Sequence, residues 1–145
     1  MESESLSMAY KRDVDKLSQY TRFVNEVTSD PSKDTNNMVE SIHINEEQGA
    51  HMSRLLTSCI GLSGEVGEYN DVIKKCLFQG APMDEETVVH LKKELGDIMW
   101  YVAQGVMALD TSFEEIIDMN IAKLSDRYPG GFDALRSASR KEGDI

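Results

Sequence analysis

The sequence is short of several features that mark common protein classes. It has two cysteines, Cys59 and Cys76, whose spacing fits neither a zinc site nor a CxxC motif, so both are expected to be buried, reduced thiols. No apolar run approaches the roughly 20 residues of a membrane-spanning helix. The start, MESESLSMAYKRD, lacks the apolar core of a signal peptide. These absences argue against a zinc module and a membrane partner, and they predict a cytoplasmic protein.

Basic residues are also in the minority, with 15 Lys and Arg against 26 Asp and Glu and a net charge of −11. Proteins bind a nucleic-acid backbone through a basic patch, so we expect no nucleic-acid partner. Alternating strand patterns, internal repeats and low-complexity blocks are absent too. With a hydrophobic content of 40%, the chain is predicted to be one all-α domain over residues 1–145, with flexible tails at 1–9 and about 134–145.

Apolar spacings of three, four and seven predict four main helices. Capping boxes at Asn45/Gln48 and Ser112/Glu115 mark the starts of the second and fourth helices, and Asp84 caps the third. The predicted helices cover residues 10–28, 45–77, 85–109 and 112–128.

Two segments carry further expectations. The polar stretch 31–45 is interpreted as a loop or short turns, with a brief helix near 38–42 as the alternative. Residues 98–109 are apolar nearly all round, which predicts a helix buried on several sides and a subunit interface.

Three glycines, Gly61, Gly64 and Gly67, indicate either a bend or close helix contact serving a site, or tight packing with no chemical purpose.

Two acidic pairs at helical spacing are the most informative pattern. Glu65 and Glu68 share one helix face, Glu94 and Asp97 share another, and a turn at 79–84 would bring the four carboxylates together. Two like charges ~4 Å apart repel by roughly 4 kcal/mol at an effective dielectric near 20. The cluster therefore requires protons or a hard divalent cation such as Mg²⁺ or Mn²⁺.

Two other interpretations of these acids are weaker. A solvated acidic face is disfavoured because the flanks are apolar and only Asp97, four residues after Lys93, has a basic neighbour. A ferritin-type di-metal bundle wants Glu-x-x-His on two helices. Neither acidic pair ends in histidine, and His43, His51 and His90 lie elsewhere in the sequence.

Basic donors complement the acidic pairs. Asn120, Lys123 and Arg127 fall at i, i+3 and i+7 on the last helix, and Lys75 lies on the same face as Glu68. Arginine can fork two hydrogen bonds to a phosphate. Metals flanked by such donors suit a polyphosphate ester, so Lys75 is expected to contribute to substrate binding.

The three segments GLSGEVGE, ELGDIMWYVA and NIAKLSDRYPGGF resemble the MazG-like all-α nucleoside triphosphate pyrophosphohydrolases. The family signature is ExxE followed by ExxD, with a later KLxxRYP element. The likeness covers residues 57–132, and the layout is similar to the short single-domain MazG proteins of bacteriophages, cyanophages especially. For a phage protein the cytoplasm would be that of the host cell.

The resemblance implies that a nucleoside triphosphate is hydrolysed to its monophosphate and pyrophosphate, with Mg²⁺, commonly two or more ions, or Mn²⁺ as cofactor. It also implies a homo-dimer or homo-tetramer. The implied catalytic residues and metal ligands are Glu65, Glu68, Glu94 and Asp97, with one glutamate of the first pair orienting or deprotonating the water. The implied triphosphate-binding residues are Asn120, Lys123, Arg127 and Tyr128.

Substrate preference has several readings. The phage resemblance favours deoxynucleotides with a purine such as dGTP first, and the alternative is a dUTP/dCTP-directed or broad-specificity enzyme. Tyr20, Phe23, Asn25 and Trp100 are candidates for contacting the base, with core packing as the alternative for each. A non-catalytic helical interaction module is a more distant alternative.

Overall fold

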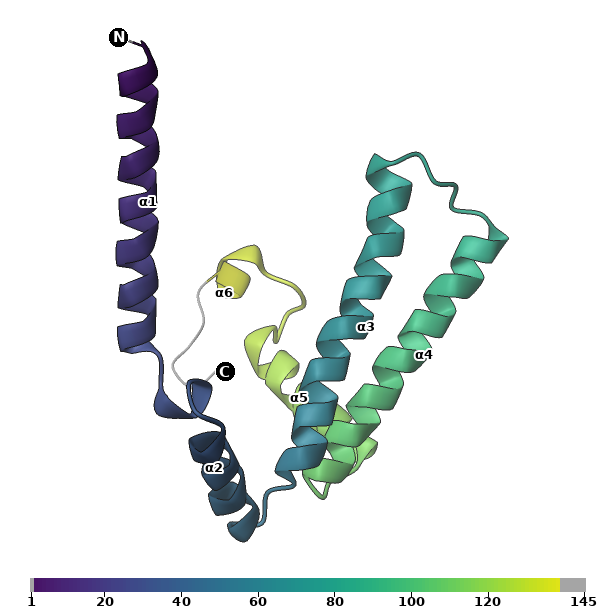
Figure 1. Cartoon of the computed structure of the whole chain (residues 1–145). Helices are drawn as coiled ribbons and strands as arrows, with labels where there is room; N and C mark the ends of the chain where they lie inside the picture. The colour runs from purple at the N-terminus through teal and green to yellow at the C-terminus, as the bar shows by residue number, and fades with distance from the viewer. Residues whose placement is uncertain (1, 139–145) are drawn as a thin grey trace. The chain divides into compact units, whose positions relative to one another are not determined.

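The computed structural model describes residues 2–138 (Figure 1). Within that range the regular structure is helical apart from one isolated bridge between Pro129 and Gly131, which confirms the all-α prediction. No helix in the described range is long and apolar enough to cross a membrane. The elements are α1 (Glu2–Val27), η1 (Asp30–Ser32), α2 (Thr35–Glu47), α3 (Met52–Phe78), α4 (Glu85–Ala108), α5 (Phe113–Arg127) and α6 (Ala134–Ala138).

The chain separates into two compact units, Met1–Gln48 and Gly49–Ile145, where the sequence predicted a single domain. The first unit contains α1, η1 and α2, and the second contains α3 to α6. All four residues of the acidic pairs belong to the second unit. The single-domain organisation and the two flexible tails stay predictions, with residues 139–145 outside the described range.

In the first unit, helix α1 begins at Glu2 rather than at residue 10. The apolar periodicity starts only near residue 10, and periodicity cannot detect a helical turn that has no apolar face to bury.

The polar stretch after Pro31 is more helical than the sequence predicted. Instead of a loop it forms the 13-residue helix α2, whose N-cap Asp34 accepts hydrogen bonds from the backbone N–H groups of Asn36 and Asn37. The hydrophobic pattern of α2 is weak, so a search for apolar periodicity misses it. The cap at Asp34 was the available signal.

The predicted capping box at Asn45 is wrong, because Asn45 lies in the last turn of α2 and its side chain donates to the carbonyl of Ser41. Gln48 is the C-cap, and Gly49 follows with φ +93°, a left-handed conformation that stops a helix at little cost to glycine. Helix α3 therefore begins at Met52, seven residues later than predicted.

Helices α3 and α4 form an antiparallel hairpin (Figure 1). As predicted, Asp84 caps α4, with its Oδ1 accepting from the Thr87 N–H at 2.9 Å. The Ser112 cap of α5 is also confirmed, since its Oγ accepts from the Glu115 N–H at 3.1 Å. The Glu115 carboxylate accepts from the Thr111 hydroxyl, where a full capping box would use the Ser112 N–H.

The two hairpin helices approach most closely where small residues meet larger ones. The buried Ser58 on α3 donates to the Tyr101 carbonyl of α4 at 2.9 Å, and a Cβ at Gly105 would lie 3.0 Å from the Ser58 hydroxyl. A Cβ at Gly61 would overlap the Tyr101 ring. Close helix contact therefore explains Gly61, whereas Cβ atoms at Gly64 and Gly67 would meet nothing within 4 Å.

The hydrophobic core of the described residues is small. Its buried hydrophobic residues are Val72, Val106 and Ala108. Within the single chain the second half of α4 is not enclosed, since Trp100 keeps 54% of its surface exposed. The subunit interface expected there stays a prediction. The cysteines are free as expected, but the prediction that both are buried is wrong because Cys59 is exposed.

Candidate functional site

Three of the four carboxylates of the acidic pairs meet between α3 and α4. Glu65, Glu68 and Glu94 each present a ligand atom, and the three atoms lie within 4.8 Å of one another. Glu94 is the most enclosed, at 7% exposure, while Glu65 is partly buried and Glu68 is exposed. The three-residue spacing within each pair places its members on one helix face, as the sequence analysis expected.

Asp97 lies near this group but outside the 4.8 Å set. Its charge still reaches Glu65, whose pKa is raised by partial burial and then by the charges of Glu68, Asp97 and Glu94. Partial burial and three neighbouring negative charges therefore oppose the ionised form of Glu65, and a bound cation would relieve that opposition.

His90 is a site residue that the sequence analysis missed. Its Nε2 lies 2.9 Å from Oε1 of Glu94, one helical turn further along α4, so Glu94 does have a basic neighbour. The i, i+4 spacing was the available signal, because residues four apart in a helix are adjacent. The sequence argument had placed His90 outside the acidic pattern because it looked for histidine at i+3.

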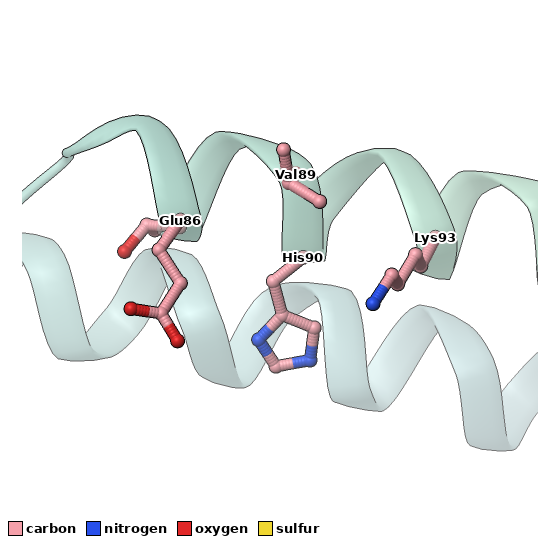
Figure 2. Close-up of a pocket in the computed structure, with 5 residues that line it drawn as sticks. Glu86, Val89, His90 and Lys93 are labelled. Atoms are coloured by element: carbon pink, nitrogen blue, oxygen red, sulfur yellow. The ribbon is translucent and has the colours of Figure 1, made fainter.

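Two shallow pockets meet at His90. One, of about 310 Å³, also contains Glu68, Asp71 and Lys75 together with Gly64 and Gly67. The other, of about 300 Å³, contains Glu86, Thr87, Val89 and Lys93. Figure 2 shows Glu86, His90 and Lys93 on one side of α4, with Val89 on the opposite side. The open space at Gly64 and Gly67 therefore borders the carboxylate cluster.

Lys75 shares the first of these pockets with Glu68, as its predicted helix face required. Its Nζ lies 2.6 Å from Oδ2 of Asp71, and Lys74 pairs with the other oxygen of that carboxylate. Hydrogen bonds from the two lysines lower the pKa of Asp71 to about 2, and Asp71 in turn raises the pKa of Lys75. Lys75 is thus a charged donor held one turn beyond Asp71 and two turns beyond Glu68.

The predicted donors of α5 are arranged differently. Asn120 and Lys123 line another pocket, of about 740 Å³, with apolar residues of the α4–α5 corner such as Leu109 and Met119. Arg127 closes α5, and its guanidinium carbon lies 5.9 Å from the ring centroid of Tyr128. Asn120 and Lys123 therefore line a different pocket from the one that contains Glu68.

Three of the candidates for base contacts are aromatic, and all three are exposed. Tyr20 and Phe23 on α1 keep 64% and 57% of their surface exposed, so core packing does not account for them in the described structure. Trp100 packs edge-on against Tyr101, with ring centroids 4.8 Å apart. Asn25 offers its backbone carbonyl to Lys33.

Comparison with known proteins gives two matches. A family model described as the MazG nucleotide pyrophosphohydrolase domain matches residues 54–132, which include all four acidic residues. The Gene 37 protein of Mycobacterium phage L5 is 38% identical over 73 residues, covering 50% of this chain and 64% of the phage protein. The chain thus aligns with less than two thirds of that relative's length. No solved structure matches.

Proposed function

Because the chain belongs to the MazG nucleotide pyrophosphohydrolase family, we propose that it hydrolyses a nucleoside triphosphate to the monophosphate and pyrophosphate. The observation that carries the proposal is the meeting of Glu65, Glu68 and Glu94, from two helices, within 4.8 Å. A helical module used only for binding would have no need to hold these like charges together.

The cluster fits a hard divalent cation. Its donors are carboxylate oxygens, the preferred ligands of Mg²⁺ and Mn²⁺, and positive charge would relieve the repulsion that raises the pKa of Glu65. We assign Glu65, Glu68, Glu94 and Asp97 as the residues that hold Mg²⁺, in two or more ions. When bound, the metal would polarise phosphoryl oxygens and lower the pKa of a bound water.

The bond changes of the proposed reaction are simple. The water oxygen bonds to the α-phosphorus, the bond from that phosphorus to the α–β bridging oxygen breaks, and pyrophosphate leaves with the electron pair. Glu65 or Glu68 accepts the proton that the water releases. Catalysis by this chain then consists of orienting the water and the phosphate chain.

Basic side chains are proposed to bind the phosphate groups of the substrate. Lys75 lines the same pocket as Glu68 of the acidic cluster. Its pairing with Asp71 keeps it charged and oriented. Arg127 presents a fork that matches phosphate geometry. Asn120, Lys123 and Tyr128 complete the proposed phosphate-binding set.

For the substrate we propose a deoxynucleotide with a purine base, dGTP first. The alternative is a dUTP/dCTP-directed or broad-specificity enzyme of the same fold. The similarity to a phage protein is consistent with a phage context, and in a phage we propose that the activity would reshape the dNTP pool during replication. Turnover of the four dNTPs and dUTP, compared at equal concentration, separates these readings, because a flat profile would remove the dGTP preference.

Product analysis tests the activity itself. Phosphorus NMR of a reaction with dGTP and Mg²⁺ is expected to show dGMP and pyrophosphate in equal amounts, and none when EDTA is present. Formation of dGDP and inorganic phosphate, or no turnover of any triphosphate, would overturn the proposed function.

We also propose that the active protein is a homo-dimer or homo-tetramer. A hairpin whose buried hydrophobic residues are Val72, Val106 and Ala108 encloses too little apolar surface to be stable alone. Met99, Trp100 and Met107 remain about half exposed along α4, which is the face expected to receive a second copy.

Sedimentation velocity tests the assembly. The native chain should sediment at a multiple of its 16.3 kDa mass, and Trp100→Glu should shift it to the monomer because a charge would be buried at the contact. Trp100→Phe is the matched control and should stay assembled. A native chain that sediments as a monomer at every concentration would contradict the assembly.

A further inference from the structure

One hydrogen bond to the carboxylate cluster comes from a residue that is not among the four proposed metal ligands. The imidazole of His90 reaches Glu94 from the preceding turn of the same helix, with 2.9 Å between Nε2 and Oε1. The His90 side chain is 55% exposed and that of Glu94 is 9% exposed. A half-exposed ring adds little to packing, so its main structural effect is this hydrogen bond.

The hydrogen bond addresses a cost at the buried end of the cluster. A buried carboxylate without a donor loses its hydration without compensation. Glutamate also has three side-chain torsions, and each must be fixed before its oxygens can meet those of another helix. His90 satisfies one oxygen of Glu94 and restricts its torsions, while Oε2 and the remaining lone pairs stay available.

This hydrogen bond is compatible with Glu94 acting as a metal ligand, because it does not have to be an ion pair. Nε2–H can donate in the neutral or the charged imidazole, so the contact does not depend on the protonation of His90. In its neutral form the ring leaves the net charge of the cluster unchanged. A lysine at this position would instead add a fixed positive charge beside the cation that the cluster is proposed to hold.

His90 also occupies a special place in the hairpin. Its ring borders two pockets. One also contains Glu68 of the cluster and Lys75, and the other, drawn in Figure 2, contains Glu86 and Lys93. Because His90 and Glu94 are on the same helix, the geometry of their contact is set by α4 itself and does not depend on how α3 packs.

We propose that His90 is a positioning residue: its Nε2–H orients the Glu94 carboxylate and thereby organises the acidic cluster for a divalent cation. This inference rests on the proposed function of the cluster. It differs from a purely structural role because its loss should change metal affinity while the helices stay folded.

The test measures Mn²⁺ binding at a single near-neutral pH, using electron paramagnetic resonance to detect the free ion. His90→Phe keeps a ring of similar size but no donor, and it should weaken Mn²⁺ binding by about 10- to 100-fold, the usual effect of losing a partner of a metal ligand. His90→Gln keeps an N–H donor at a similar reach and should recover most of the affinity. His43→Phe, the same substitution on α2, is the matched control and should bind as the native chain does.

Kinetics provide the second readout. In His90→Phe the Mg²⁺ concentration needed for half-maximal pyrophosphate release should rise by the same factor, while kcat at saturating Mg²⁺ stays near the native value. Circular dichroism checks that the helical signal is retained.

The outcomes are distinguishable. Native Mn²⁺ affinity in His90→Phe, or equal loss in His90→Phe and His90→Gln, would overturn the role of His90 and leave the proposed function standing. Absence of Mn²⁺ binding by the native chain would overturn the proposed function, and this inference with it.

Discussion

The ring of Tyr101 on α4 occupies the space that a Cβ at Gly61 on α3 would fill. Because the two helices are antiparallel, four residues forward from Gly61 and four residues back from Tyr101 lead in the same direction. They lead to Glu65 and Asp97. The closest helix contact and the carboxylate cluster are therefore one turn apart, and the first sets the spacing of the second.

Gly61→Ala tests this coupling. The added methyl group must push the Tyr101 ring away, and such overpacking should cost about 1–3 kcal/mol in the free energy of unfolding. Gly64→Ala is the control, because its methyl group would enter open space and alanine favours a helix over glycine by ~1 kcal/mol. Because the helix-propensity gain is common to both variants, urea titrations monitored by circular dichroism should show Gly61→Ala less stable than Gly64→Ala by about 1–3 kcal/mol. Equal stabilities would contradict the account.

Glu65→Gln should reverse its effect on stability when metal is added. Without a cation, partial burial and the charges of Glu68, Asp97 and Glu94 oppose the ionised Glu65 and raise its pKa. The native carboxylate then destabilises the fold increasingly as the pH rises from 4.5 through that raised value. In EDTA near neutral pH the glutamine variant should melt higher than the native chain, and in excess Mg²⁺ it should melt lower. The same order in both buffers would count against a metal at Glu65.

Asp71 should define an acid limb of stability. Hydrogen bonds from Lys74 and Lys75 lower its pKa from 3.8 to about 2, so folding is favoured by its charge above 3.8. That contribution is lost as the pH falls from 3.8 through about 2, because the unfolded chain takes up the proton near 3.8 and the folded chain only near 2. Asp71→Asn should flatten the melting temperature over this window relative to the native chain, and an unchanged slope would contradict the assignment.

Arg127→Ala should weaken triphosphate binding more than turnover. Removing a charge-assisted contact to phosphate costs roughly 1.5–3 kcal/mol, equivalent to a KM about 10- to 150-fold higher. Arg136→Ala, on α6, removes the same charge outside the proposed donor set of α5 and should leave KM unchanged. Equal KM values for the native chain and Arg127→Ala would remove Arg127 from the phosphate site.

Local sequence signals predicted the second unit well. Asp84 and Ser112 cap their helices through hydrogen bonds between neighbours in the chain, so the sequence alone specifies them. The acidic pairs were predictable for the same reason, since the helical repeat fixes which residues share a face. Gly61 was singled out correctly, but its partner Tyr101 comes from another helix and could not be named in advance.

The misses have physical causes as well. Helix α2 lacks a strong apolar face, and Asn45 has the composition of a cap while sitting near the end of a helix. The exposure of Trp100 could not be predicted, because an apolar helix looks the same whether its cover comes from its own chain or from a second copy. His90 was missed because the sequence argument looked for histidine three residues from an acid, whereas its contact with Glu94 spans four residues.

The central claim is that carboxylates from two neighbouring helices bind a divalent cation. Anomalous diffraction from crystals soaked in Mn²⁺ tests it most directly. The account predicts an anomalous peak bounded by Glu65, Glu68 and Glu94, which disappears in crystals of Glu68→Ala. Crystals of the native chain with these side chains directed apart into solvent, and no peak between them, would contradict it.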